Sequence, residues 1–277
     1  MERKIWFITG ISSGLGKALA EAVMESGDFV VGTFRNPIQA DVFSNAHKGD
    51  ALGLTMDITK IKDIEKAAKT IKKQFGRLDV LVNNAGFGFA GAVEEATASE
   101  VKTVFEANVF GTFNVTKAFL PLLRVQRSGH IIQMSSHGGI KAFAGFGIYN
   151  AAKFAVEGFS EALAQEVAPL NIKLTIVQPG PFRTGFANAA FQEAALKIED
   201  YNATAGAFRE RMKAVDGKQE GDPAKAAQAI VDMVKNGNAP LRFPLGKVPM
   251  MTIQMKLDSV KKDLEDGRAI AESVVFE

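Results

Sequence analysis

The sequence predicts an α/β fold in which a doubly wound parallel sheet of six to seven strands carries helices on both faces. Short apolar runs alternate along the chain with segments whose apolar residues recur at helical spacing. Small and polar residues follow the apolar runs, at the points where strands of a parallel sheet end. No stretch rich in Pro, Gly or Ser divides residues 1–277, so we expect a single domain.

Short apolar runs predict six strands, and a run of only three residues could form a seventh. They cover residues 5–9, 29–33, 52–56, 78–82, 130–135, 173–178 and 241–243.

The helices between these strands carry recognisable start and stop signals. Gly27 and Gly76 close helices over 15–25 and 61–75. A Thr97-x-x-Glu100 capping box opens a long helix toward Pro121, and a further helix covers 149–167. Asp222-Pro223 starts a helix that runs to residue 235.

Two later segments are less regular. Residues 183–220 show no strand pattern, and we expect them to form an insertion that acts as a substrate lid over the site. Residues 248–277 form a C-terminal helical extension, with an amphipathic helix over 250–264.

The composition excludes several classes of function. The chain lacks cysteine, which removes disulfides, thiolate metal sites and a cysteine nucleophile. Its 3 histidines show no ligand spacing, so no metal is expected. The net charge is +2 with acids and bases interspersed, which does not favour nucleic acid. The apolar run at residues 5–8 is too short for a secretory signal, and no window suits a membrane span, so a cytoplasmic location is expected.

A glycine-rich turn joins the first strand to the first helix. In this position it favours close approach of the backbone to a pyrophosphate at a helix N-terminus, as in the Rossmann fold. The spacing G-x-x-x-G-x-G departs from the commoner G-x-G-x-x-G, and a plain loop is the alternative. The predicted contacts of this turn are Gly10, Ser12, Ser13, Gly14, Leu15 and Gly16.

The end of the second strand carries an arginine, Arg35, and no acid. A carboxylate there would bind a ribose 2′-hydroxyl, whereas a guanidinium pairs with a 2′-phosphate. Arg35 therefore favours NADP(H) over NAD(H), unless it is a solvated loop residue. Asp57, Ile58, Asn83, Ala85 and Gly86 follow the next two strands and complete the predicted dinucleotide site, although Asn83 also suits a turn cap.

Tyr149 and Lys153 lie four residues apart on a predicted helix and therefore share one face. An ammonium group beside a phenol favours the phenolate and is expected to lower the pKa of Tyr149, which makes it a general acid or base. Ser136 ends a strand in the same mouth, and its hydroxyl can donate to a carbonyl oxygen that gains charge. The Tyr149–Lys153 spacing alone is a weak signal of catalysis, and so is Ser136 alone.

Taken in order, these motifs with Asn108 and Pro179-Gly180 resemble a classical member of the short-chain dehydrogenase/reductase family, over residues 3–184. Phe34-Arg35 and residues 241–246 look most similar to its NADP-preferring, hydroxysteroid-dehydrogenase-like members. The resemblance implies a ketoreductase or carbonyl reductase in which Tyr149 exchanges a proton with the substrate oxygen.

The resemblance also implies roles for the remaining residues. Lys153 would bind the nicotinamide ribose, and Asn108 would hold a water that relays protons to Lys153. The residues expected near the nicotinamide are Pro179, Gly180 and Thr184. Pairing of helices 99–121 and 149–167 across a two-fold axis would give a homodimer or homotetramer.

Aromatic residues near the motif ends favour an apolar pocket for a hydrophobic or aromatic ketone, or for its alcohol. The predicted substrate contacts are Phe89, His137, Phe143, Phe146, Phe182 and Phe186, with Phe87 and Met212 as further lining residues. The alternatives are a non-catalytic NADP(H)-binding regulatory protein and a different enzyme on the same scaffold, such as an epimerase or enoyl reductase.

Overall fold

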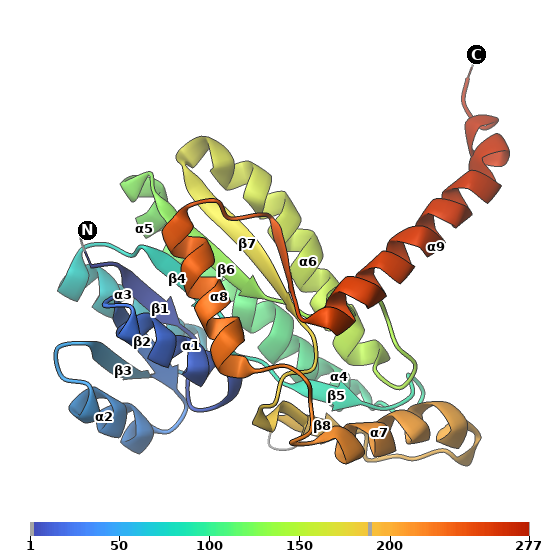
Figure 1. Ribbon diagram of the computed structural model, residues 1–277, viewed down its shortest axis with the longest axis horizontal. Helices are drawn as coiled ribbons and strands as arrows, with labels where there is room; N and C mark the ends of the chain where they lie inside the picture. The colour runs from blue at the N-terminus through green and yellow to red at the C-terminus, as the bar shows by residue number, and fades with distance from the viewer. Residues whose placement is uncertain (1–2, 188–189, 277) are drawn as a thin grey trace.

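The computed structural model describes residues 3–187 and 190–276. Seven parallel strands form one sheet in the order β3-β2-β1-β4-β6-β7-β9 (Figure 1), which confirms the predicted fold class. The strands are β1 (Ile5–Ile8), β2 (Phe29–Phe34), β3 (Ala51–Thr55), β4 (Val80–Asn83), β6 (Gly129–Met134), β7 (Ile172–Pro179) and β9 (Arg242–Leu245).

Both faces of the sheet are buried under helices because neighbouring strand residues are apolar on either side. Trp6 of β1 packs in the cluster that contains α1 (Gly14–Glu25) and α8 (Pro223–Asn236). Phe7 packs in the opposite cluster. That cluster contains α3 (Ile61–Phe75), α5 (Thr112–Gln126) and α6 (Gly147–Val167). The sheet is thus a rigid support for the loops at its ends.

Three local features differ from the sequence analysis. Helix α2 (Pro37–Ala46) was missed, although Asn36 caps it and accepts from the Ile38 amide at 2.9 Å. The long helix from the capping box is α4 (Ala98–Phe105), a π-helical turn (Glu106–Gly111) and α5. It continues past Pro121 to Gln126, because Leu123 beyond the proline is buried in the core.

The 183–220 segment, called the lid segment below, contains a strand where none was expected. Strand β8 (Phe191–Glu193) pairs in parallel with β5 (Gly88–Ala90), which follows β4. Runs of three residues are too short to show a periodicity, so only the tertiary pairing reveals them. The lid segment continues to α7 (Ala207–Val215), where Arg209 forms a buried ion pair with Glu95 at 2.6 Å.

Helix α9 (Lys247–Glu272) extends the predicted 250–264 helix in both directions. Its first turns contact the body through Pro249 and Thr252, and the remainder projects away from the molecule (Figure 1). Within residues 3–187 and 190–276, no helix combines the length and apolar character that crossing a bilayer requires.

Candidate active site

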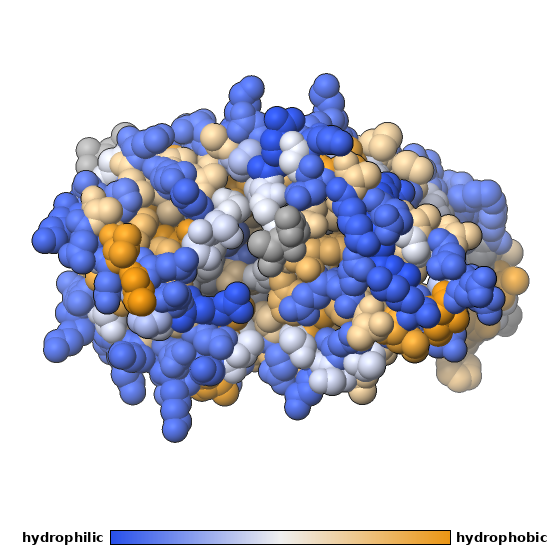
Figure 2. Space-filling view, turned by 90° about the horizontal axis from the view of Figure 1, so that it is seen from below, coloured by the Kyte–Doolittle hydropathy of each residue, from blue (hydrophilic) through white to orange (hydrophobic). Residues whose placement is uncertain are grey.

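A cavity of about 1390 Å³ lies where the carboxyl ends of the strands meet the lid segment. Loops that follow β1, β2, β3, β4, β6 and β7 line one side of it, and residues 184–219 supply most of the other. Figure 2 faces this edge of the molecule, and apolar surface gathers around its central hollow. The volume exceeds the ~300–1,000 Å³ of an ordinary ligand pocket, which leaves room for two bound molecules.

The glycine turn after β1 lines the cavity with all six predicted residues. Gly10 has φ +69°, and a Cβ there would lie 3.0 Å from the Ala85 Cβ. A Cβ on Gly16 would lie 2.3 Å from Nδ2 of Asn84, so the first turn of α1 approaches the loop after β4 closely. Asn84, which the sequence analysis did not single out, donates to the carbonyl oxygens of Thr9 and Gly10, each at 2.9 Å. The turn is therefore held open toward the cavity.

Arg35 and Asp57 line the same cavity, after β2 and β3. Arg35 is exposed. Asp57 accepts from the Thr59 amide at 3.0 Å and from its hydroxyl at 2.8 Å. Burial opposes ionisation of Asp57, but these bonds and the charges of Lys60 and Arg35 hold its pKa below the ordinary value. An exposed guanidinium thus lines the same cavity as the glycine turn.

Ser136, Tyr149 and Lys153 meet in the middle of the cavity, and all three are buried. The Lys153 ammonium lies 5.7 Å from the centroid of the Tyr149 ring and donates to the Met134 carbonyl at 2.8 Å. The Ser136 hydroxyl accepts from the Gly138 amide at 3.0 Å. Two consecutive turns of α6 and the end of β6 therefore bring a hydroxyl, a phenol and an ammonium group to one point.

The expected lowering of the Tyr149 pKa is not found. Burial raises the pKa of the phenol, and a hydrogen bond with Ser136 only partly opposes this shift. The ammonium group of Lys153 is directed to a carbonyl and not to the phenol oxygen, so its charge does not offset the burial. The free protein therefore holds Tyr149 as a protonated phenol, which is the form that donates a proton.

Glu157 lies one turn beyond Lys153 and was missed by the sequence analysis. It is buried and accepts from the Gln178 side chain at 3.0 Å, while Arg242 lies 3.5 Å from its other oxygen. Burial lowers the pKa of Lys153 to about 8, and the charge of Glu157 opposes that shift. The i, i+4 spacing from Lys153 was a usable signal for this contact.

Three predicted site residues do not line the cavity. Asn83 is buried and donates to Thr116 at 2.9 Å and to Gln133 at 3.0 Å, so it holds β4 against its neighbours. Asn108 exchanges two hydrogen bonds with the Phe87 backbone, at 2.9 and 3.0 Å.

Phe89 is the third, and it packs in a small core against Val104 and Ala152. Its position in β5 turns it away from the cavity, which a spacing argument could not show because β5 itself was not predicted. The water-mediated role of Asn108 stays a prediction.

Aromatic rings surround the phenol on the lid side. Phe146 stacks on Tyr149 with ring centroids 4.3 Å apart, and Phe186 meets its edge at 5.9 Å. Phe143, Phe182, Phe87 and Met212 also line the cavity as predicted, and the structure adds Phe208, Arg211, Val215 and Val248. These additions come from segments without a motif, where sequence spacing carried no signal.

His137 lines the cavity from a short 3₁₀ turn (His137–Gly139) that follows β6. One ring nitrogen is 3.1 Å from the hydroxyl of Thr252 on α9, and the ring packs against Phe143. Burial lowers the pKa of His137 to about 4, so the ring is neutral at ordinary pH.

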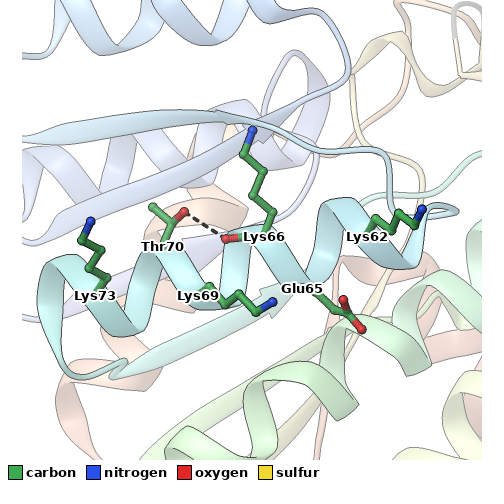
Figure 3. Close-up of a pocket in the computed structure, with 6 residues that line it drawn as sticks. All are labelled: Lys62, Glu65, Lys66, Lys69, Thr70 and Lys73. Atoms are coloured by element: carbon green, nitrogen blue, oxygen red, sulfur yellow. Dashed lines mark hydrogen bonds between the residues drawn. The ribbon is translucent and has the colours of Figure 1, made fainter.

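A second, open depression on α3 has a different character (Figure 3). Its lining is Lys62, Glu65, Lys66, Lys69, Thr70 and Lys73. The lysines extend outward from the helix in different directions, and Thr70 donates to the Lys66 carbonyl of its own helix at 2.9 Å. This is a solvated helix face and not a binding site.

The residues of the main cavity fit a dinucleotide. The left-handed glycine turn, the N-terminus of α1 and the Arg35 guanidinium present donors along one side. Ala85, Gly86, Pro179, Gly180 and Thr184 line the stretch between that turn and Tyr149.

Comparison with known proteins agrees with this geometry. Residues 4–195 match the family model described as short chain dehydrogenase. A 3-ketodihydrosphingosine reductase of Bacteroides thetaiotaomicron is 41% identical over 249 residues, which cover 89% of each chain. The crystal structure of a short-chain dehydrogenase from Streptomyces avermitilis is 39% identical and superposes with a TM-score of 0.93, over 99% of this chain and 100% of that one.

Structures with bound dinucleotides share the fold. A short chain dehydrogenase/reductase of Burkholderia phymatum in complex with NAD has a TM-score of 0.82, with 21% identity and 95% of each chain covered. ElxO with NADP bound has a TM-score of 0.72, with 24% identity over 88% of this chain and 97% of that one. The predicted NADP-preferring, hydroxysteroid-like branch is not distinguished by these matches. The chain is an oxidoreductase that belongs to the short-chain dehydrogenase family.

Proposed function

We propose that the protein is an NADP(H)-dependent oxidoreductase that interconverts a ketone or aldehyde and an alcohol on a hydrophobic or aromatic substrate. The observation that carries the proposal is the buried Ser136–Tyr149–Lys153 group between the glycine turn and an aromatic wall in one cavity. A non-catalytic dinucleotide-binding protein has no use for a buried phenol and ammonium at this point.

The chain's own residues would act on the substrate oxygen. A nicotinamide dinucleotide held by the glycine turn would supply the hydride in reduction and accept it in oxidation. In reduction, the Tyr149 phenol donates its proton to the carbonyl oxygen, and the Ser136 hydroxyl donates a hydrogen bond to the same oxygen. The Lys153 ammonium, 5.7 Å from the centroid of the Tyr149 ring, attracts the negative charge that then forms on the phenolate, although in the free protein this attraction does not outweigh burial. The surrounding rings of Phe146 and Phe186 exclude water from this step.

Two observations support the finer parts of the proposal. Arg35 favours the 2′-phosphate of NADP(H), since its guanidinium lies in the cavity wall after β2 and no acid takes its place. The aromatic wall favours an apolar substrate. The name of the Bacteroides relative, which states a reductase for a keto compound, also supports a ketone.

A change of Tyr149→Phe tests the function directly. We expect turnover with NADPH and a responsive ketone to fall by about 10²–10⁴-fold, because the proton donor is lost while the ring stays in place. The chain has one other tyrosine, Tyr201, whose hydroxyl bonds Glu94 at the surface. Tyr201→Phe is therefore a matched control that keeps its turnover, and unchanged turnover in the Tyr149 variant would refute the assignment. A panel of ketones of increasing apolar length, followed by NADPH absorbance, identifies the substrate class.

The proposal includes a homo-oligomer in the cytoplasm, with no nucleic-acid or membrane partner. Phe113 of α5 and Phe154 of α6 are exposed on neighbouring helices, and Phe110 precedes them in the π-helical turn. Apolar rings exposed in this way favour pairing of this face with a second copy. The mass in solution of a Phe113→Glu variant, compared with that of the parent protein, tests it.

A further inference from the structure

Helix α7 of the lid segment turns one face toward the cavity, and one residue of that face is charged. Phe208, Arg211, Met212 and Val215 line the cavity, and their spacing places them on the same side of the helix. Three of the four are apolar, as a wall for an apolar substrate requires. Arg211 is exposed and lies in this wall beside them, so its charge belongs to the side of α7 that borders the cavity.

The charge of Arg211 is not neutralised by the acids around it. The two other bases of α7 pair with acids, Arg209 with Glu95 at 2.6 Å and Lys213 with Glu210 at 3.0 Å. Among residues 3–187 and 190–276, none forms an ion pair or a hydrogen bond with the Arg211 guanidinium, whose contact is instead an aromatic ring. Its N–H donors are therefore available to an anion that enters the cavity.

A stack of rings connects Arg211 to the reacting group. The Arg211 Cζ lies 5.2 Å from the centroid of the Phe208 ring. The Phe208 centroid lies 4.8 Å from that of Phe146, which in turn lies 4.3 Å from that of Tyr149. At ~5 Å per contact, the guanidinium is at most about 15 Å from the Tyr149 ring. A substrate whose carbonyl group lies at Tyr149 and whose apolar part follows these rings would end at Arg211.

We propose that the substrate is an apolar ketone or alcohol with a carboxylate at the end remote from its reacting carbon, and that Arg211 binds this carboxylate. The inference rests on the proposed function of the site. A guanidinium offers paired N–H donors that match the two carboxylate oxygens, and the contact with Phe208 holds it at the edge of the aromatic wall. A phosphate group favours a cluster of bases, whereas the neighbouring Lys213 is already paired with Glu210.

Paired substrates test the carboxylate. The assay compares a series of aryl alkyl keto acids of increasing chain length with their methyl esters, with NADPH as reductant. In the parent protein, kcat/KM for the best acid should exceed that for its ester by about 10–100-fold, the range that hydrogen bonds to a charged group provide. Arg211→Met, which keeps an apolar contact with Phe208, should remove most of this difference.

Lys213→Met is the matched control, because Lys213 is an exposed base on the same helix that does not line the cavity. It should keep the preference for the acid. Equal kcat/KM for acid and ester in the parent protein would overturn the proposal, as would a preference that survives Arg211→Met. A higher kcat/KM for a ketone that ends in an amine or a phosphate would overturn it too.

Direct binding separates this inference from the proposed function. Dodecanoate carries a carboxylate and an apolar chain but no ketone, so its binding in the presence of NADPH does not depend on turnover. It should bind the parent protein more tightly than dodecanol does, and Arg211→Met should weaken it about 10–100-fold. Reduction of neutral ketones, with dodecanoate bound equally by parent and variant, would overturn this inference and leave the proposed function intact. Dodecanoate binding that requires Arg211, with no ketone reduced, would support the carboxylate site and refute the proposed function.

Discussion

The sheet side of the cavity is made of backbone turns and a few polar side chains, whereas an aromatic wall beside Tyr149 combines Phe143 and Phe146, before α6, with Phe186 and Phe208 of the lid segment. The glycine turn, Arg35 and Ser136 lie in loops that directly follow strands of the parallel sheet, and the sheet fixes their positions. The lid segment instead contacts the body through the short parallel pair of β5 and β8 and through the buried ion pair Glu95–Arg209. The difference separates chemistry, which needs rigid placement, from substrate choice, which needs a replaceable apolar surface.

The largest effect is expected on the sheet side, at Lys153. Lys153→Met should reduce turnover by about 10²–10⁴-fold, because the ammonium group that stabilises the phenolate is removed. The fold should persist, since methionine fills the same buried space. Steady-state kinetics and thermal unfolding measure the two quantities, with Lys117→Met on the exposed face of α5 as the control. Turnover equal to that of the control would contradict the role.

On the lid side, a break in the Glu95–Arg209 pair should affect stability first. Glu95 is fully buried and also accepts from the amides of Ala92 and Ile198, at 2.8 and 2.9 Å. Glu95→Gln or Arg209→Met leaves a buried group without its partner and should cost about 3–5 kcal/mol of the free energy of unfolding. Urea denaturation measures this, and Glu210→Gln, at an exposed ion pair, is the control expected to change little.

The same pair predicts a pH dependence. Hydrogen bonding from Arg209 lowers the pKa of Glu95 to about 2, from an ordinary value of 4.5. Its stabilisation is therefore complete above pH 4.5 and is lost as the pH falls toward 2. The Arg209→Met variant lacks the ion pair, so it has none of this stabilisation to lose as the pH falls. The difference in free energy of unfolding between parent and variant should therefore shrink between pH 4.5 and 2. A difference that stays constant down to pH 2 would contradict the assignment.

A smaller effect is expected at the dinucleotide end of the sheet side. Arg35→Ala should weaken NADPH about 10–100-fold more than NADH, the range that a hydrogen bond to a charged group provides. Direct binding measurements with both dinucleotides test this, and Lys60→Ala, a neighbouring exposed base, should leave their ratio unchanged. Equal losses for NADPH and NADH would show that Arg35 does not contact the 2′-phosphate.

The smallest change should come from Glu157. Its charge raises the pKa of Lys153 against the effect of burial, so Glu157→Gln should lower that pKa further below about 8. The ammonium form is then lost at lower pH, and the alkaline limb of kcat/KM should move to lower pH. Gln178 can still donate to the amide oxygen, so the fold is kept. Glu166→Gln, exposed on the same helix, is the control, and identical pH profiles for both variants would remove Glu157 from the site.

The sheet and the reacting group followed from local patterns. Short apolar runs, a capping box and helix-ending glycines predicted the seven strands and most helices, because each depends on a few adjacent residues. The i, i+4 spacing of Tyr149 and Lys153 on α6 likewise placed both side chains on one face. The glycine turn was predictable since only residues without a Cβ tolerate its left-handed φ and close contacts.

The orientation of single side chains needed the tertiary structure. Asn83 and Phe89 lie near the expected motifs, yet they face the core, because neighbouring residues in a strand point to opposite sides and β5 left no periodicity to read. The Tyr149 pKa also depended on burial from several elements and not on Lys153 alone.

The sequence by itself determined the fold class and the position of the glycine turn between the first strand and the first helix. It also identified the group formed by Ser136, Tyr149 and Lys153. These depend on spacing along one chain segment, which a sequence records directly. Only the tertiary structure decided which rings face the phenol, how Glu95 and Arg209 hold the lid segment, and that most of α9 is exposed. Glu95 and Arg209 are 114 positions apart in the sequence, and the energies of such contacts depend on burial that no local pattern encodes.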